Sequence, residues 1–222
     1  IGKALSFDGS DDYAYLGDAH GVFDITSELT VELWIYPTGR AGYWRNILVK
    51  AYQYWVNIDP DGYIRFRIRD NGVTKDAYST SIKATLNQWY HVVGVLRGTS
   101  IELYVNGKLI AKNSFDGTID SSDYPLELAR WTPGDNDRFE GIIDEVRIYK
   151  RALSSEEIWW HYSLVFYFDG FRELLGREPY QYPDSYSYTQ GVFGYAFEKT
   201  DFTSSLAYDY DDSMYANPSG ET

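Results

Sequence analysis

One stretch decides the fold of this chain: residues 139–158 read FEGIIDEVRIYKRALSSEEI. Apolar and polar side chains alternate through its first half, and in an extended strand successive side chains point to opposite faces. We therefore expect a closing strand with Ile143 on one face and Val146 and Ile148 on the other. Because one of these faces is apolar, the strand belongs against a hydrophobic core.

A helix-start signal follows this strand. Ser154 precedes Glu157 by three residues, which is the spacing of a capping box, where each side chain bonds a free backbone N–H. We expect a short helix from Ser155 to Tyr162, and this is the one helix that the sequence supports.

The residues before this stretch predict short strands separated by turns. Residues 54–58 and 63–69 alternate on either side of the turn 59–62, and Asn-Gly pairs follow at 71–72 and 106–107. Gly and Asn tolerate positive φ, so these pairs indicate turns between antiparallel strands. Further alternating runs lie at residues 30–36, 91–96, 101–105 and 108–111. So many strands with one helix predict an all-β fold, an antiparallel two-sheet sandwich.

Three phrases occur in order along this region. They are GKALSFDGSDDY at residues 2–13, WYHV at 89–92 with LYVNG at 103–107, and the strand and cap at 141–158. Together they resemble the laminin-G-like domains of the concanavalin A-like lectin/glucanase jelly-roll superfamily. The resemblance implies a jelly roll over residues 1–163, with one short C-terminal helix after the closing strand.

Composition and charge argue against several classes of partner. The net charge of −13 opposes nucleic acid and acidic membranes, because binding to them draws on Lys and Arg that neutralise phosphates. The chain has no cysteine for a disulfide framework and no run of about 18 apolar residues for a membrane span. It shows no signal peptide, and Ile1 lies inside a family phrase, so we expect further sequence upstream.

The last part of the chain, residues 164–222, has a different character. From residue 165 onward three basic residues oppose ten carboxylates, a charge of −7, and nine residues are tyrosine. One interpretation is an acidic linker or a partly disordered tail. The interpretation that we favour is the start of a second, degenerate repeat, because GVFGYAF at 191–197 echoes IGKAL at 1–5.

An additional strand follows from the second interpretation. Residues 165–168 resemble the strand that precedes the opening phrase in this family. Unpaired strand edges are templates, so this segment could pair with its own domain or with a neighbouring chain. The chain could then be a structural, self-assembling surface or filament protein whose partner is another copy of itself.

The resemblance also implies a structural Ca²⁺ ion that joins the first and last strands. The positions that match its ligands are Asp8 and Asp144, with the Gly9 carbonyl as a further oxygen. Calcium takes about six to eight hard oxygens, so more ligands are needed. The spare candidates are Asp11, Asp12 and Asp169. The alternative is that Asp8 caps an Asp-Gly turn and that Asp144 bonds backbone amides.

Outward side chains on two strands suit a sugar. If Val56 and Phe66 point into the sandwich, alternation turns their neighbours outward. A concave sheet with an indole beside Arg and Asn offers stacking and bidentate hydrogen bonds to hydroxyls. The candidate ligand-binding residues are Trp55, Asn57, Arg65 and Arg67 on strands and Trp44 and Trp131 in loops. The sequence thus predicts a lectin-like module that binds a glycan or a surface protein, outside the cell or at its surface.

Two other groups of residues favour structural roles. Trp34 also alternates outward, but the family commonly holds an aromatic residue at this position, which favours packing. His20, His91 and His161 stand alone in the sequence. His91 belongs to the WYHV phrase, for which we expect a structural hydrogen bond.

Catalysis is not expected. Glycoside hydrolases need two carboxylates across a cleft, and the E-x-D-x-x-E pattern of jelly-roll hydrolases does not occur here. Asp144 and Glu145 are adjacent, so an alternating strand would point them to opposite faces. The sequence also contains no nucleophile elbow and no phosphate loop.

Overall fold

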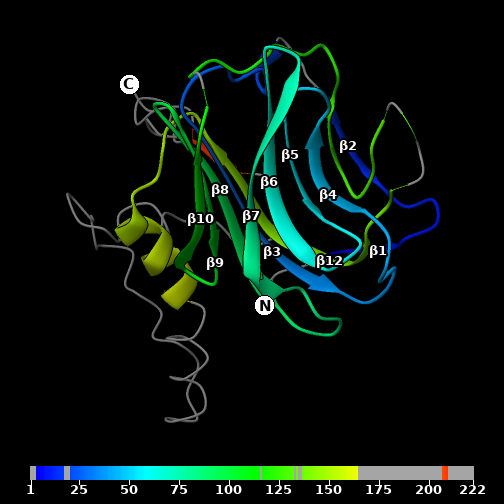
Figure 1. Cartoon of the computed structure of the whole chain (residues 1–222). Helices are drawn as coiled ribbons and strands as arrows, with labels where there is room; N and C mark the ends of the chain where they lie inside the picture. The colour runs from blue at the N-terminus through cyan, green and yellow to red at the C-terminus, as the bar shows by residue number, and fades with distance from the viewer. Residues whose placement is uncertain are drawn as a thin grey trace, which may run out of the picture.

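The described part of the protein forms two facing β-sheets, with a short α-helix that follows β12 (Figure 1). The computed structural model describes residues 4–17, 21–115, 117–132, 134, 137–164 and 207–209. The seven-stranded sheet contains β1 (Leu5–Asp8), β3 (Leu29–Pro37), β8 (Tyr90–Arg97), β9 (Ser100–Val105), β10 (Lys108–Ser114), β12 (Glu140–Tyr149) and β13 (Ala207–Asp209). The six-stranded sheet contains β2 (Ala14–Gly17), β4 (Arg45–Lys50), β5 (Tyr54–Ile58), β6 (Tyr63–Asp70), β7 (Val73–Lys83) and β11 (Leu126–Leu128).

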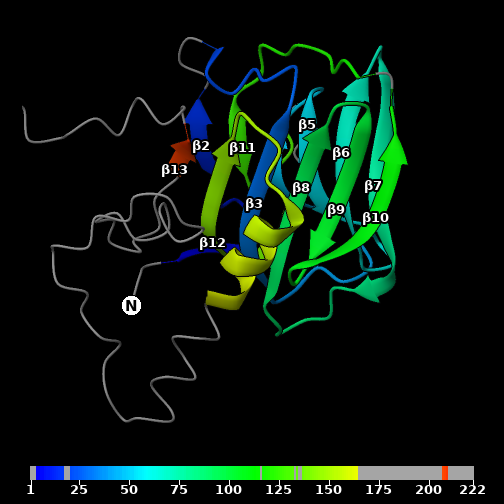
Figure 2. The same cartoon turned by 90° about the vertical axis from the view of Figure 1, so that its left-hand side faces the viewer.

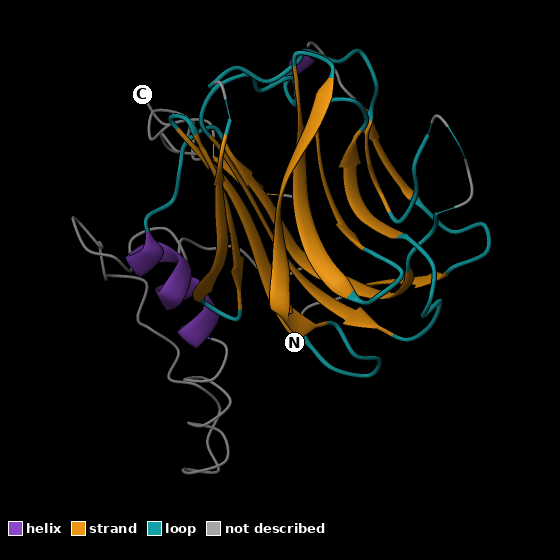
Figure 3. Ribbon diagram, viewed as in Figure 1, coloured by secondary structure: helices purple, strands orange, loops and turns teal. Residues whose placement is uncertain are grey.

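Strands that are neighbours in the sequence, such as β1 and β2, often lie in different sheets. The seven-stranded sheet has the order β1-β12-β3-β8-β9-β10, with β13 beside β12, and the six-stranded sheet has the order β2-β11-β4-β5-β6-β7. The pairs along these two paths are antiparallel, whereas β13 pairs with β12 in parallel. Figure 3 shows the two layers of strands with the helix to one side. This architecture confirms the predicted all-β jelly-roll sandwich.

The hydrophobic core lies between the two sheets. Strands of both sheets send side chains into it, such as Leu33 from β3, Val56 from β5 and Phe66 from β6, all fully buried. Gly94 in β8 meets Phe66 across the sandwich so closely that a Cβ would collide with the Phe66 ring. The layers therefore approach each other at this point because one residue has no side chain.

The predicted turns occur where the sequence placed them. Asn71 and Gly72 join β6 to β7, and Asn106 and Gly107 join β9 to β10. All four residues have positive φ, between 48° and 75°. Two consecutive positive φ angles match the right-handed twist of the flanking strands, which fixes the register of each hairpin.

The closing strand β12 departs from simple alternation. Its pairing with β3 shifts register between Asp144 and Arg147, and Glu145 has a φ of 50°. A bulge adds one residue to a strand and so reverses which face the later side chains occupy. Ile143 and Val146 consequently both enter the core, and the prediction that they lie on opposite faces is wrong.

The helix covers residues 155–164 and begins at the predicted capping box. Ser154 N donates to Glu157 Oε2 at 2.7 Å, and Glu157 N donates to Ser154 Oγ at 3.2 Å, which confirms both capping bonds. Figure 2 shows the helix lying on the outer face of the seven-stranded sheet. It is held there by a small apolar cluster of Val93, Val95, Tyr104, Leu153 and Ile158.

The C-terminal extension is described at Leu164 and at residues 207–209. Leu164 lies in the helix, and β13 pairs with Arg147–Tyr149 of β12. The strand expected at 165–168, Asp169 and the repeat expected from residue 191 lie outside the described residues. Within the described part of the chain, no helix combines the length and the apolar character needed to cross a membrane.

Candidate functional site

The outer face of the six-stranded sheet carries an open pocket of about 240 Å³. Trp55 and Asn57 of β5 and Arg67 of β6 line it, together with Trp44 before β4 and Trp131 after β11. The other lining residues are Asn46, Tyr52, Arg69, Thr74 and Asp137. The pocket therefore combines aromatic rings with guanidinium, amide and carboxylate groups.

Strand alternation explains how these side chains meet. On β5 the side chains of Tyr54, Val56 and Ile58 belong to the core, so those of Trp55 and Asn57 point to the opposite face. The β5–β6 hairpin then sets Trp55 directly opposite Arg67. A local hairpin register thus places an indole beside a guanidinium.

The structure brings five of the six expected ligand-binding residues into this pocket. Arg65, the sixth, lies beside it and is fully engaged: it donates to Asp59 Oδ2 from Nε and Nη2 at 2.9 and 2.7 Å, and to Asp76 Oδ2 at 2.7 Å. Burial would lower the pKa of Arg65, but the hydrogen bonds to the two carboxylates outweigh burial and raise it. Arg65 therefore holds the sheet surface together.

Aromatic rings form the apolar part of the pocket. Trp55 is 5% exposed and lies under Trp131, with ring centroids 5.4 Å apart at 70°. Tyr52 meets Trp131 edge-on at 5.7 Å and is more exposed. The ring surface open to a ligand therefore comes from Trp44, Tyr52 and Trp131, while Trp55 supports them from below.

Arg67 lies between two indoles. Its guanidinium carbon is 5.1 Å from the ring centroid of Trp44 and 5.5 Å from that of Trp55, within cation–π range. Its Nε is buried and has no hydrogen-bond partner in the described residues, because the nearest carboxylate oxygen of Asp76 is 3.8 Å away. Burial lowers the pKa of Arg67, Asp76 opposes this shift, and the charge of Arg65 adds to it.

Two amides complete the polar part of the pocket. Asn57 Nδ2 donates to Asn46 Oδ1 at 3.5 Å, and Asn46 Nδ2 donates to the Asp137 carbonyl at 2.9 Å. Asn57 Oδ1 is buried and accepts no hydrogen bond from the described residues. Asn46 was not among the predicted residues, and the turn at 50–54 could not have identified it, because simple pairing from that turn sets Ile47 opposite Asn57. A register shift between Asn46 and Leu48 brings Asn46 to this place instead.

On the outer face of the seven-stranded sheet, polar side chains form a buried cluster under the helix, in contrast to the open pocket on the other sheet. Glu32 is fully buried and accepts hydrogen bonds from His91 Nε2 and His161 Nδ1, each at 2.9 Å, and from Tyr149 Oη at 3.2 Å. Burial would raise the pKa of Glu32, but His161 and His91 outweigh burial and hold the pKa well below its usual range. The prediction that His91 and His161 stand alone is wrong, because the helix brings His161 onto the sheet.

Trp34 belongs to this covered cluster. It is 8% exposed, stacks on Tyr162 of the helix with ring centroids 5.9 Å apart at 14°, and lies 5.0 Å from the His91 ring. The expected packing role of Trp34 is confirmed. Glu145 points to the same region, where it pairs with Arg147.

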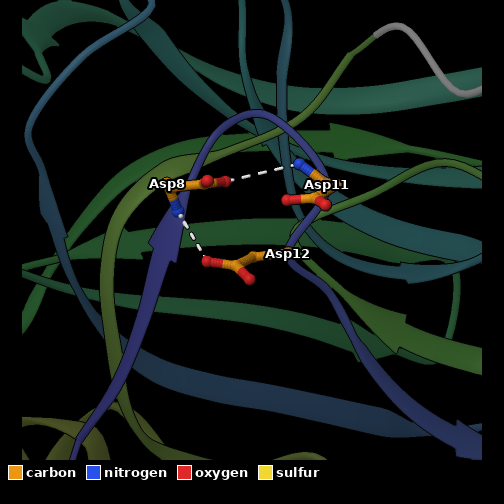
Figure 4. Close-up of side chains that lie close together, drawn as sticks. All are labelled: Asp8, Asp11 and Asp12. Carbon is orange, nitrogen blue, oxygen red and sulfur yellow. Dashed lines mark hydrogen bonds between the residues drawn. The ribbon is translucent and has the colours of Figure 1, made fainter.

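Three carboxylates converge in the loop between β1 and β2 (Figure 4). Ligand oxygens of Asp8, Asp11 and Asp12 all lie within 4.8 Å of one another. Asp8 Oδ1 accepts Ser10 N at 2.7 Å and Asp11 N at 3.3 Å, and Asp8 N donates to Asp12 Oδ2 at 3.1 Å. The Ser10 bond is the main cause that lowers the pKa of Asp8. These hard oxygens fit part of a calcium coordination shell and also cap the turn.

The structure does not bring Asp144 to this loop. The β1–β12 register pairs Asp8 with Glu140, which leaves Asp144 four residues away, or about 13 Å along the strand. The Asp144 carboxylate instead accepts Glu145 N at 2.9 Å. The Gly9 carbonyl accepts Arg40 Nη1 at 2.9 Å. The long-range register of the two strands therefore separates the predicted calcium ligands.

Comparison with known proteins gives one family and several related folds. A family model described as the concanavalin A-like lectin/glucanases superfamily matches residues 8–159. No curated protein is detectably similar in sequence.

Three solved structures show the shared fold. The binding domain of Paraclostridial Mosquitocidal Protein 1 aligns with a TM-score of 0.62 and 17% identity over 73% of this chain and 44% of that one. Domain 4 of AbnA, a GH43 extracellular arabinanase from Geobacillus stearothermophilus in complex with arabinotriose, gives 0.57 and 22% over 72% and 76%. The Ruminococcus gnavus IT-sialidase CBM40 bound to alpha2,3 sialyllactose gives 0.57 and 17% over 72% and 96%. Likeness at this identity establishes the fold alone.

Proposed function

The chain belongs to the concanavalin A-like lectin/glucanase superfamily, and from this premise we propose that it is a non-catalytic carbohydrate-binding module. The observation that carries the proposal is the pocket on the six-stranded sheet. There three accessible aromatic rings meet Asn57 and Arg67, whose Oδ1 and Nε have no hydrogen-bond partner among the described residues. Two proteins that share the fold were solved with arabinotriose and with sialyllactose, which supports a saccharide ligand.

The lining residues divide the recognition of a sugar between them. Trp44, Tyr52 and Trp131 offer flat apolar faces to the C–H groups of a pyranose or furanose ring. Asn57 Oδ1 accepts a hydrogen bond from a hydroxyl, and Arg69 donates one. An open pocket of about 240 Å³ suits one or two sugar residues at a chain end or along a chain.

We place the protein outside the cell or at its surface. The related arabinanase domain is extracellular, and a free glycan would be met there. A surface protein that carries the glycan is then the natural partner.

A glycan array tests the proposal, with the full chain as probe. Trp44→Ala and Trp131→Ala should abolish glycan retention while the protein stays folded, with a loss of stability of about 1 kcal/mol. Trp160→Ala is the matched control, because Trp160 is a 37% exposed tryptophan on the helix beyond the opposite sheet. An array on which no glycan is retained, or pocket variants that bind as well as the control, would show the proposal to be wrong.

Strand complementation is a second candidate function, supported by β13. On the edge of β12, β1 pairs only with Glu140–Ile143, and β13 pairs with Arg147–Tyr149. This edge accepts a strand beyond the bulge, and the same edge would accept a strand from a neighbouring copy. Light scattering over a range of concentrations decides the matter, since a mass that stays monomeric throughout rules out exchange between chains.

We also propose a structural calcium ion held by Asp8, Asp11 and Asp12. Calcium would neutralise three carboxylates that otherwise repel one another. It would stabilise the loop that connects the two sheets.

A further inference from the structure

We infer that the pocket selects saccharides that carry a carboxylate, such as a terminal sialic acid or a uronic acid, and that the Arg67 guanidinium anchors this group. The inference rests on the proposed carbohydrate-binding function, because it names the ligand class of the same pocket.

Arg67 can offer its N–H groups to a ligand in the pocket. Trp44 and Trp55 contact its guanidinium at 5.1 and 5.5 Å. A guanidinium donates hydrogen bonds in its own plane, where its N–H groups form a fork. The Arg67 side chain lines the pocket, and its Nε has no hydrogen-bond partner within the described part of the chain. A carboxylate is the group that matches this fork, because it accepts two parallel hydrogen bonds.

Arg65 explains why Arg67 remains available. Asp76 is the carboxylate shared between them, and it lies 2.7 Å from Arg65 Nη1 but 3.8 Å from Arg67 Nε. Arg65 also holds Asp59, so its own donors are satisfied. Arg67 is thus a partly buried cation whose desolvation Asp76 and Asp59 offset only in part, and a ligand carboxylate would offset it further.

The balance of charge in the pocket favours an anion in a chain that is acidic as a whole. Arg67 and Arg69 line the pocket, with Asp137 as the acidic lining residue. Arg69 Nε is 3.8 Å from Asp120 Oδ2, which is also too long for a hydrogen bond. The net charge of −13 repels polyanions at long range. A short saccharide with one or a few carboxylates fits this combination.

Asn57 favours a ligand that carries a hydroxyl beside its carboxylate. Its Oδ1 is buried, has no partner in the described residues and needs a donor, which a sugar hydroxyl supplies. Acetate or chloride could satisfy Arg67 but not this acceptor. The inferred ligand therefore presents a carboxylate and a hydroxyl together, beside a face that stacks on Trp131.

Isothermal titration with matched acids and esters tests the inference on the full chain. The probes are 3′-sialyllactose and trigalacturonate, each compared with its own methyl ester, which keeps the shape and removes the charge. At least one acid should bind about tenfold more tightly than its ester, since a charge-assisted hydrogen bond contributes roughly that factor. The arm that shows the difference identifies sialic or uronic acid as the source of the carboxylate.

Variants assign the effect to Arg67. Arg67→Gln should reduce the ratio of acid to ester affinity to about one, whereas Lys108→Gln on exposed β10 makes the same change in net charge and should keep the ratio. Arg67→Lys keeps the charge but loses the fork, so the ratio should fall part of the way, and this variant serves if Arg67→Gln does not fold. Wild-type protein that binds both esters, or only neutral glycans of the array, as tightly as the acids overturns the inference and leaves the proposed function standing. A protein that retains no glycan at all overturns both.

Discussion

The two outer faces of the sandwich carry similar residues and put them to different uses. Under the helix, Glu32 and Trp34 of β3 are buried, and among the described residues the partners of Glu32 all lie within the same domain. On the opposite face, Arg67 and Asn57 keep polar atoms without partners among the described residues and border an open pocket. Alternation turns polar and aromatic side chains outward on both sheets, and the helix decides which of them become structural.

The strongest way to break this comparison is to exchange tryptophan for alanine on each face. Trp34→Ala should lower the free energy of unfolding by about 3–5 kcal/mol, because it leaves a cavity beneath the helix. Trp131→Ala should cost about 1 kcal/mol, because this ring is half-buried at the pocket rim. Urea unfolding of both variants measures the difference. Equal losses of stability would show that the two faces are not distinct.

A smaller effect concerns the buried carboxylate. Glu32→Gln should cost about 1.5–3 kcal/mol at pH 7, the range for losing charge-assisted hydrogen bonds. The pKa of Glu32 is depressed in the folded state, so its stabilisation is present above its unfolded value near about 4.3 and is lost as the pH falls below it. The groups that face it are His91, His161, Tyr149 and Arg147.

Unfolding at several pH values measures this dependence. The difference between wild type and Glu32→Gln should be fully present at about pH 6 and should shrink below about pH 4. Glu28→Ala, at an exposed position just before β3, should show no such trend. A difference that grows as the pH falls would contradict the assignment of the charge to Glu32.

Local chemistry made much of the fold predictable. Asn71-Gly72 and Ser154 with Glu157 act within a few residues, and the turns and the cap occur as predicted. The bulge at Glu145 was not predictable, because no Gly or Pro marks it and only the pairing of β12 with β3 requires it. Alternation therefore predicts which face of a sheet a side chain occupies only up to the next bulge in the strand.

In the candidate site, too, local contacts could be predicted from the sequence and long-range contacts could not. Trp55 and Arg67 face each other across a short hairpin, so their meeting could be predicted from alternation. The packing of the helix over the other face could not be predicted, because His161 contacts Glu32 from 129 residues away along the chain. Asp8 and Asp144 were paired through the resemblance alone, and the register between β1 and β12 separates them.

Weakening the helix cap tests whether the helix-covered face and the pocket face are independent. Ser154→Ala removes one capping bond and should cost about 1 kcal/mol. Because the helix lies on the seven-stranded sheet, the affinity of the pocket for a retained glycan should stay unchanged. The measurement pairs thermal unfolding with titration, and a fall in affinity equal to the fall in stability would mean that the two faces are coupled.

The smallest expected effect lies in the loop that joins the sheets, where carboxylates are exposed and have only each other and backbone amides. A chelator should lower stability by no more than about 1 kcal/mol, the linkage expected for calcium at roughly four times its Kd. Asp12→Asn keeps the hydrogen bond to Asp8 N but removes a charge, so it should abolish the response to calcium. Asp144→Asn should retain the response, because Asp144 lies along the strand from the loop. A melting temperature that ignores both calcium and chelator would leave this loop as a capped turn, and a response lost only in Asp144→Asn would restore the ligand pair expected from the sequence.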